Sequence, residues 1–409
     1  MHPFEHEWYV VTPPGLESIT RRELAELGQA PMAVEPGGLT LRGGLDAVYA
    51  ANLHLRTASR ILVRAAEFHA STFYELERRA KRVPWAAFVA PGSAVEFRVT
   101  SRKSKLYHQR AVAERLAAAV AHAVPDVRVA SGGSEDDGAP DVQRFVVRLL
   151  HDECTVSADS TGEHLHRRGY RLATAKAPLR ETLAAAALMA AQWDPAAPLL
   201  DPMCGSGTIP IEAALLARRV APGLGRRFAF ERWPGFEAER WAQLVAEAQE
   251  RVVPRAPAPI LGSDRDAGAI EAAAANAARA GVAGDIEFRR AAISAITPPQ
   301  RAGWVVSNPP YGVRVGAQRD LRNLFAQLGN VLRRRCPGWH VALLSAEREL
   351  ERQVGLAFAA GFETNNGGIR VRLVTAAVPG GPPHRDAGRA MDSRPSPSAP
   401  GSPGAPSSP

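Results

Sequence analysis

The sequence predicts an α/β fold with a mostly parallel sheet, preceded by a region of α+β structure. From about residue 178 onward, short apolar segments alternate with Ala-rich helical segments, which is typical of a parallel sheet covered by helices on both faces. Within the first 160 residues, shorter strand-like segments are interspersed with helix-like ones. The 409 residues suit two or three domains.

Local patterns place the elements of the N-terminal region. Apolar alternation predicts strands at 8–12, 94–100 and 144–150, and helical periodicity predicts helices at 15–27 and 108–123. Residues 131–140 are rich in Gly, Ser and Asp, so we expect an exposed loop within this region.

The second region contains five candidate parallel strands followed by a hairpin. The strands are expected at 198–201, 259–264, 286–291, 304–308 and 340–345. A final pair, 362–365 and 369–376, is separated by Asn366-Gly367-Gly368, which suits a tight antiparallel turn. Five alternating strands closed by a hairpin resemble the Rossmann-like, seven-stranded layout of class I methyltransferases.

Residues 379–409 are rich in Pro, Ser and Gly and have almost no large apolar side chains. Burial in such a segment cannot offset the loss of chain entropy on folding. We therefore expect a disordered tail.

Composition excludes several classes of protein. No uninterrupted apolar run approaches the roughly 20 residues of a membrane span, so we expect a soluble protein. The first seven residues lack the basic head and apolar run of a secretory signal, which predicts a cytoplasmic location. The three cysteines, Cys154, Cys204 and Cys336, are far apart in sequence, so we expect reduced thiols and no zinc.

The net charge of +8 and the pI near 9.8 favour a polyanionic partner such as nucleic acid. Arg supplies 46 of the 50 basic residues, so the charge alone could also reflect a GC-rich genome. Clustering is more informative. Between Phe97 and Arg115 six basic residues accompany one acid, Glu114, and a second basic cluster extends from His164 to Arg180.

The segment Asp201-Pro-Met-Cys-Gly-Ser-Gly-Thr208 follows a predicted strand and precedes a predicted helix. Gly205 and Gly207 would allow the backbone to approach a ligand without Cβ clashes, which indicates a nucleotide-like cofactor. No Gly-Lys-Ser/Thr follows, so the segment is not a Walker loop. A tight structural turn is the alternative interpretation.

Asp264 ends the next predicted strand, where a carboxylate can accept two hydrogen bonds from a ribose diol. Asp266 is expected to cap the helix predicted at 267–280. The 63 residues that separate Asp201 from Asp264 exceed what a simple strand–helix–strand unit needs, so we expect an insertion between them.

The tetrapeptide Asn308-Pro309-Pro310-Tyr311 ends the fourth predicted strand of this region. Its two prolines form a stiff turn, leaving the Asn308 side-chain oxygen and the Pro309 carbonyl free to accept the hydrogens of an amino group. Tyr311 could stack on the base that carries this amine. A purely structural turn is the alternative. The segment contains no Cys, which argues against methylation at a pyrimidine carbon, and Cys204 is expected to be a small buried residue.

Together these segments resemble the bacterial THUMP-domain methyltransferases that form N2-methylguanosine in large-subunit ribosomal RNA. The resemblance extends over residues 9–378. Beyond the cofactor motifs it is carried by Pro14-Gly-Leu16, Glu23-Leu24, Leu55-Arg-Thr-Ala-Ser-Arg-Ile-Leu62, Phe73-Tyr-Glu-Leu76, Val83-Pro-Trp85, Ser101-Arg-Lys-Ser-Lys-Leu-Tyr-His108, Leu165-His-Arg-Arg-Gly-Tyr-Arg171, Ala177-Pro-Leu-Arg-Glu-Thr-Leu183, Ala221-Pro-Gly-Leu224 and Phe228-Ala-Phe-Glu-Arg-Trp233.

The resemblance implies three domains and a division of labour between them. Residues 1–45 would be a ferredoxin-like segment, 46–163 a THUMP domain that binds RNA, and 164–378 the catalytic domain, which would bind S-adenosylmethionine and a flipped-out guanine of 23S rRNA. The expected cofactor-binding residues are Asp201, Met203, Gly205, Gly207, Thr208, Asp264, Ala292 and Asn308. The expected RNA-binding residues are Arg98, Lys103, Lys105, His108, Arg167, Arg168 and Arg180, which would mainly contact phosphates.

One position departs from the family pattern. Relatives have an Asp after the third strand that binds the adenine amino group of the cofactor, whereas Ala292 stands at the aligned position here. The departure puts the affinity for the cofactor in question but not the fold.

Other functions use the same chemistry. An Asn-Pro-Pro-Tyr segment also suits methylation of adenine N6 or of glutamine in release factors, but the N-terminal RNA-binding region argues against DNA and protein substrates. Guanine N2 of a tRNA acceptor stem is the main alternative target. A non-catalytic RNA-binding assembly factor is a further alternative, supported by Ala292 and opposed by the intact residues Asn308 to Tyr311.

Overall fold

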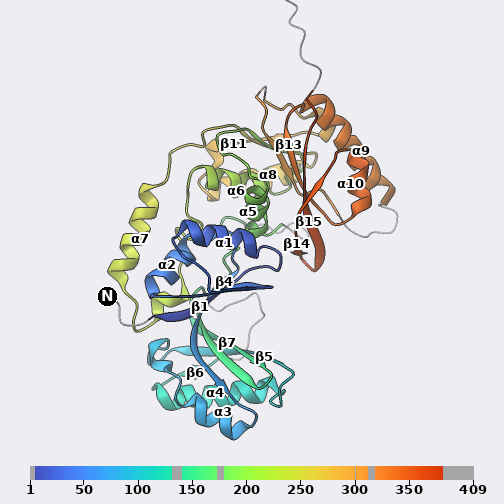
Figure 1. The fold of residues 1–409 in the computed structure, drawn as a ribbon. Helices are drawn as coiled ribbons and strands as arrows, with labels where there is room; N and C mark the ends of the chain where they lie inside the picture. The colour runs from blue at the N-terminus through green and yellow to red at the C-terminus, as the bar shows by residue number, and fades with distance from the viewer. Residues whose placement is uncertain (1–4, 131–140, 173–178, 300, 312–317, 381–409) are drawn as a thin grey trace, which may run out of the picture. The chain divides into compact units, whose positions relative to one another are not determined.

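The computed structural model describes residues 5–130, 141–172, 179–299, 301–311 and 318–380, apart from the side chains of residues 318 and 319. The described residues contain two sheets, one of eight strands and one of seven (Figure 1). The predicted loop at 131–140 and all but the first two residues of the predicted disordered tail lie outside the described residues.

The N-terminal sheet has the strand order β2-β3-β1-β4-β8-β7-β5-β6. Its long central strand, β4 (Arg60–His69), pairs with β1 on one side and with β8 on the other. The sheet is therefore continuous across residue 45, where the sequence analysis places a domain boundary. The other strands are β1 (His6–Val11), β2 (Ala33–Glu35), β3 (Gly38–Gly43), β5 (Ala94–Arg102), β6 (Arg128–Val129), β7 (Val142–Leu150) and β8 (Glu153–Asp159).

Helices α1 (Glu17–Glu26), α2 (Leu45–His54), α3 (Phe73–Ala80) and α4 (Gln109–Ala123) accompany this sheet. Fully buried aromatic side chains fill its core, and the Trp85 and Phe145 rings meet edge to face with centroids 5.0 Å apart. The predicted α+β character of the N-terminal region is confirmed.

The second sheet has the order β11-β10-β9-β12-β13-β15-β14. Strands β9 to β13 pair in parallel, and β15 adds antiparallel to β13. This is the class I methyltransferase arrangement that the sequence predicts. The strands are β9 (Leu199–Asp201), β10 (Ile260–Asp264), β11 (Ile286–Arg290), β12 (Trp304–Ser307), β13 (His340–Ser345), β14 (Ala359–Asn366) and β15 (Ile369–Ala377).

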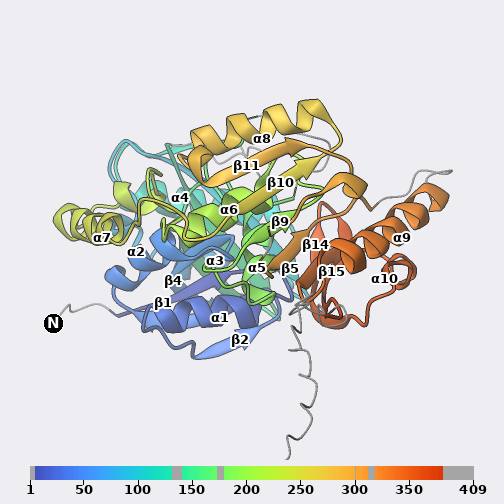
Figure 2. The same cartoon turned by 90° about the horizontal axis from the view of Figure 1, so that it is seen from above.

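Successive strand residues point to opposite faces of this sheet, and each face has its own core. Leu199 and Val306 pack with α5 (Glu181–Ala190), α6 (Thr208–Ala217) and α8 (Ala267–Arg279), while Leu200 and Val305 pack with α9 (Gln318–Arg335) and α10 (Arg348–Val354). Figure 2 shows α8 over β10 and β11. Apolar strands therefore alternate with helices because both faces of each strand are buried.

The hairpin and one helix cap agree with their sequence signals. Asn366 pairs with Ile369, so the turn consists of Gly367 and Gly368, whose φ angles of +57° and +84° favour glycine. The Asp266 carboxylate accepts the N–H groups of Gly268 and Ala269 at 2.8 and 3.3 Å and caps α8.

The predicted insertion follows α6 and includes helix α7 (Ala238–Glu250). It packs on the N-terminal sheet: Phe230 meets Tyr49 with ring centroids 4.4 Å apart, and the Trp233 Nε1–H donates to Gln143 Oε1 at 2.8 Å. Figure 1 shows α7 beside α2. The insertion is therefore an apolar connection between the catalytic domain and the N-terminal region.

Candidate active site

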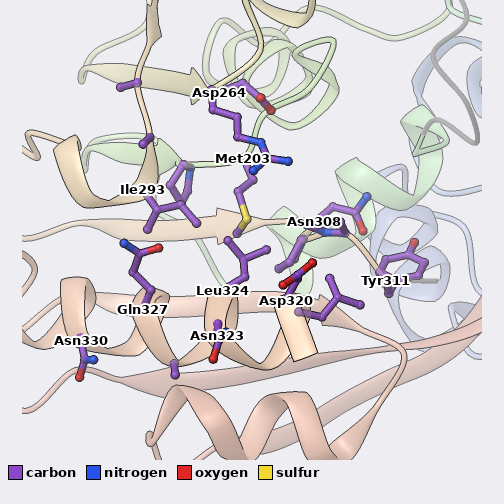
Figure 3. Close-up of a pocket in the computed structure, with 18 of the residues that line it drawn as sticks. Met203, Asp264, Ile293, Asn308, Tyr311, Asp320, Asn323, Leu324, Gln327 and Asn330 are labelled. Carbon is purple, nitrogen blue, oxygen red and sulfur yellow. The ribbon is translucent and has the colours of Figure 1, made fainter. Parts of the chain in front are cut away.

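A cavity of about 1210 Å³ lies at the carboxyl ends of the parallel strands, where α/β sheets commonly bind ligands. Its wall contains Met203 after β9, Asp264 at the end of β10, Ala292 after β11 and Asn308 after β12. Helix α9 forms the opposite wall (Figure 3). The three motifs that the sequence analysis identifies therefore meet at one cavity.

Asp264 is fixed at one end of the cavity by two backbone groups. Its Oδ2 accepts the Gly205 N–H and its Oδ1 accepts the Asp266 N–H, both at 3.0 Å. Each carboxylate oxygen can accept a further hydrogen bond, and the residue lines the cavity. The position fits the expected binding of a ribose diol.

The two glycines of the loop after β9 serve different purposes. Both have positive φ, +51° at Gly205 and +84° at Gly207. A Cβ at Gly205 would meet nothing within 4 Å, whereas a Cβ at Gly207 would lie 2.9 Å from the Ala273 Cβ and 3.1 Å from the Phe288 ring. Gly207 is therefore required for packing against α8 and β11. Neither glycine lines the cavity, and nor does the buried Thr208 at the start of α6.

Asp201 lies beneath the cavity and is 1% exposed. Its Oδ1 accepts the Ser307 hydroxyl at 2.6 Å and the Met203 N–H at 3.2 Å. Burial raises the pKa of this carboxyl to about 7. Instead of the direct cofactor contact that the sequence analysis expects, Asp201 ties the loop after β9 to the residue before Asn308.

The segment Asn308 to Tyr311 forms the other end of the cavity. The Asn308 Oδ1 is buried and has no hydrogen-bond partner among the described residues. A buried acceptor without a partner costs free energy and is typical of a site that binds a donor. The Asn308 Oδ1 is therefore the acceptor at this end of the cavity that a ligand donor would satisfy.

Tyr311 is held in place by the hairpin, which the sequence analysis treats only as a turn. Asn366 Nδ2 donates to the Tyr311 phenol oxygen at 2.7 Å. Burial raises the pKa of Tyr311, while hydrogen bonds from Asn366 and Asn308 oppose this change. The phenol is thus fixed at the rim, and Asn366 joins the site as a residue that sequence reasoning missed.

Sequence reasoning also missed the wall formed by α9. Asp320, Asn323, Gln327 and Asn330 all line the cavity, and their spacing of three, four and three residues places them along one side of a helix. Figure 3 shows Asp320 and Gln327 pointing from α9 toward the strand ends. In a sequence, polar residues spaced three or four apart after an Asn-Pro-Pro-Tyr segment would indicate such a wall.

Ala292 lines the cavity, as its alignment predicts, beside Ile293. Its carbonyl accepts the Ala295 N–H at 2.8 Å in a short 3-10 turn. Gln327 of α9 points toward Ile293 across the cavity (Figure 3). The side chain at position 292 offers no hydrogen bond to a ligand.

Several of the predicted RNA-binding residues are exposed. Lys103, Lys105 and His108 lie in the loop between β5 and α4. The Lys105 N–H donates to Asp152 Oδ1 at 2.7 Å, which fixes the loop. The Tyr107 ring is 67% exposed and stands 4.1 Å from the His108 ring. This loop presents positive charge next to an aromatic surface.

The structure corrects the expectation for Arg168. Its side chain is 3% exposed and pairs with Glu212 at 3.5 Å, and it donates to the carbonyl of Arg56 at 2.8 Å. It therefore holds the junction between the N-terminal region and the catalytic domain and cannot contact phosphates. Arg98 is partly buried beside Glu96.

Arg167 and Arg180 of the second basic cluster both lie close enough to His166 to affect its pKa. Both contribute to the low pKa of His166, which is about 3 mainly because of burial and then because of the neighbouring positive charges. Arg180 is exposed at the start of α5. This cluster keeps its concentration of positive charge although Arg168 is buried.

Among the described residues, no three His, Cys, Asp or Glu side chains gather as a metal site would require. The three cysteines are free and buried, and burial raises the pKa of Cys204. No described helix is long and apolar enough to cross a bilayer.

Comparison with known families gives two matches. Residues 168–375 match the RMKL-like methyltransferase domain, and residues 7–62 match the RlmL ferredoxin-like domain. The second match extends past residue 45, where the sequence analysis ends the ferredoxin-like segment, and includes part of β4.

Curated relatives are similar over most of the chain. A putative RNA methyltransferase of Synechocystis sp. is 35% identical over 88% of this chain and 94% of its own length. A ribosomal RNA large subunit methyltransferase K/L of Methylococcus capsulatus is 37% identical over 91% of this chain. The chain spans 51% of the length of that K/L relative.

Solved structures agree with the fold and the family. A putative methyltransferase complexed with SAH is 28% identical, with a TM-score of 0.82 over 93% of this chain and 100% of its own. A structure from Listeria monocytogenes, described as a predicted N6-adenine-specific DNA methylase, is 33% identical with a TM-score of 0.79 over 90% of this chain and 96% of its own. The chain belongs to the RMKL-like methyltransferase family.

Proposed function

We propose that this protein is an S-adenosylmethionine-dependent RNA methyltransferase that forms N2-methylguanosine, with large-subunit ribosomal RNA as its substrate. The observation that carries the proposal is the buried, unpartnered Asn308 Oδ1 at the cavity, opposite the fixed carboxylate of Asp264. The names of the K/L relatives point to the same RNA.

The residues at the two ends of the cavity suit two different ligands. When bound, the cofactor supplies a methyl group carried by a positively charged sulfur. Asp264 would accept hydrogen bonds from its ribose, Ala292 and Ile293 would cover its adenine, and Met203 would lie between these contacts and Asn308. Gly205 supports this arrangement by donating to Asp264.

Asn308 and Pro309 would activate the amine of the target base. The lone pair of an exocyclic amine is delocalised into the ring, which makes the nitrogen a poor nucleophile. When the Asn308 Oδ1 and the Pro309 carbonyl accept its two hydrogens, electron density returns to the nitrogen and its lone pair is aimed. Tyr311, held by Asn366, provides a surface on which the base can stack.

We assign RNA binding to the N-terminal region, with a THUMP domain between the ferredoxin-like domain, whose match ends at residue 62, and the methyltransferase domain, whose match begins at residue 168. The exposed charges of Lys103, Lys105 and His108 would neutralise phosphates and position the RNA. Because this RNA is made in the cytoplasm, we place the protein there as well.

Radiolabelled S-adenosylmethionine and fractionated RNA test the proposal. The RNA comes from a strain that lacks the enzyme, and its 23S, 16S and tRNA fractions are incubated separately before nucleosides are separated by chromatography. Label in N2-methylguanosine from the 23S fraction is the expected result. The Asn308→Ala variant serves as the control for contaminating methyltransferases.

Other outcomes contradict the proposal in distinct ways. Label in N2-methylguanosine of tRNA would support methylation of guanine N2 but would show that the substrate is tRNA and not 23S rRNA. Label in N6-methyladenosine would reject the guanine assignment. Cofactor binding without transfer to any fraction would favour a non-catalytic assembly factor.

A further inference from the structure

We propose that Asp320 selects guanine over adenine by accepting the N1–H of the target base. This inference rests on the proposed function, because it concerns the base whose amine Asn308 and Pro309 hold. It names the residue of α9 that would make the site specific for guanine.

Position is the first argument. Asp320 lies near the start of α9 and lines the same cavity as Asn308 and Tyr311. Figure 3 shows its carboxylate directed from α9 toward the end of β12, where Asn308 lies. The second cavity carboxylate of the described residues, Asp264, is already fixed by two backbone N–H groups at the end of β10.

The second argument is the orphaned acceptor at Asn308. The buried Asn308 Oδ1 has no partner among the residues described, so this end of the cavity is suited to an amine donor. Once Asn308 and Pro309 hold the two amine hydrogens, N1 is the ring nitrogen beside the amine on the Watson–Crick edge of the base, and N3 lies on the other side of the amine. In guanine N1 carries a hydrogen, whereas N3 does not.

The chemistry of that edge decides between the bases. Guanine presents the N1–H donor beside its amine, whereas adenine presents a bare N1 lone pair beside its own amine. An ionised carboxylate can only accept hydrogen bonds. Asp320 therefore stabilises guanine in this orientation and repels adenine, which combines an attractive contact with a repulsive one.

The other polar residues on this wall cannot discriminate in the same way. Asn323, Gln327 and Asn330 also line the cavity, but each is an amide with both a donor and an acceptor. An amide can rotate to satisfy either base. Among the cavity-lining residues described on α9, the acceptor-only side chain is Asp320.

An analogue of guanine tests this contact. 2-Aminopurine keeps the amine at position 2 but has a bare N1 and lacks the O6 carbonyl, and the loss of O6 affects the wild type and the Asp320→Asn variant alike. A synthetic RNA that spans the target site is prepared with guanine or with 2-aminopurine at the modified position, and kcat/KM is measured for both. The wild type should prefer guanine by about 10- to 100-fold, which is the usual size of one well-formed base contact.

The Asp320→Asn variant should reduce this preference to about threefold or less, because the amide can donate to the bare N1. Its affinity for S-adenosylmethionine, measured by titration calorimetry, should remain unchanged, as should its melting temperature. Glu349→Gln makes the same chemical change on α10, where the Glu349 side chain is 63% exposed, and should keep the wild-type preference.

Two results would overturn the inference. The first is an Asp320→Asn variant that keeps the full preference for guanine, and the second is one that loses cofactor affinity without a change in preference. Failure of the proposed function looks different, because the wild type would then transfer no methyl group to the guanine-containing RNA.

Discussion

At the scale of single residues, the cavity depends on a small number of polar atoms with defined partners. Asn308 provides an acceptor without a partner among the described residues, and Asp264 provides a carboxylate that two backbone groups hold in place. A preorganised acceptor needs no reorientation when the substrate binds. The reaction therefore depends on Asn308 more strongly than cofactor binding does.

Replacing Asn308 by Ala should lower kcat by about a hundredfold or more, because one lost preorganised contact costs roughly 3 kcal/mol of barrier. The affinity for S-adenosylmethionine, measured by titration calorimetry, should change little. Asn365→Ala is a matched control, since Asn365 is exposed on β14. Turnover close to the wild-type rate would remove Asn308 from this role.

Replacing Ala292 by Asp should tighten cofactor binding, because Ala292 lines the cavity and offers no side-chain acceptor. An added acceptor for the adenine amino group contributes about 1 to 3 kcal/mol, or roughly 5- to 150-fold in affinity. The gain should be smaller for an S-adenosylhomocysteine analogue without that amino group. Equal changes for the two ligands would show that position 292 is not at the adenine edge.

At the scale of structural elements, the parallel strands bring the motifs to the same edge of the sheet. A side-chain hydrogen bond also links the ends of two neighbouring strands. Asp201 at the end of β9 accepts the Ser307 hydroxyl at the end of β12. The loop after β9 and the segment that begins at Asn308 are thereby joined beneath the cavity. A buried carboxyl in this position makes the folded state sensitive to pH.

Asp201→Asn should change how stability depends on pH. Burial raises the pKa of Asp201 from 3.8 to about 7, so between these values the folded protein keeps a proton that the unfolded chain releases. The wild type therefore loses stability as pH rises through this window. The free energy of unfolding of the variant should rise relative to that of the wild type over this range, by on the order of a few kcal/mol, and its melting temperature should rise with it.

The control for this effect is the same comparison at higher pH. Above the window both states of the wild type are ionised, so the difference between the two proteins should level off. A difference in melting temperature that stays constant from about pH 4 to about pH 8 would contradict the raised pKa.

The sequence predicted the positions of strands and turns better than it predicted which side chains pack together or line the cavity. Strand β10 begins one residue later than expected, and the hairpin turn is confirmed with Asn366 moved into the strand, because apolar runs and Gly-Gly pairs are local signals. The burial of Arg168 was not predictable, since its partner Glu212 lies 44 residues away. The sequence did not predict that the polar face of α9 lines the cavity, because a polar helix face is equally typical of a helix exposed to solvent.

At the scale of the whole molecule, the basic loop that contains Lys103 and Lys105 lies in the N-terminal region, while the cavity lies in the catalytic domain. The insertion connects the two by placing Phe230 and Trp233 in the core of the N-terminal sheet. A buried apolar junction of this kind keeps an RNA held by one region in a fixed relation to the cavity of the other. Affinity and chemistry should therefore respond to different substitutions.

Reversing the charges at Lys103 and Lys105 to Glu should weaken RNA binding and leave cofactor affinity unchanged. Both side chains are exposed, and each phosphate contact that is lost should lower the salt dependence of binding by about one unit of logarithmic slope. The pair Arg348→Glu and Arg352→Glu on α10 is the matched control. Unchanged RNA affinity across a salt titration would assign the two lysines to an ordinary solvated surface.

A structure of the protein with S-adenosylhomocysteine and a substrate RNA fragment tests the central claim most directly. We expect a flipped-out guanine whose N2 lies about 3 Å from both the Asn308 Oδ1 and the Pro309 carbonyl oxygen, with Tyr311 against the base. A guanine amine bound elsewhere, or adenine in this position, would contradict the account.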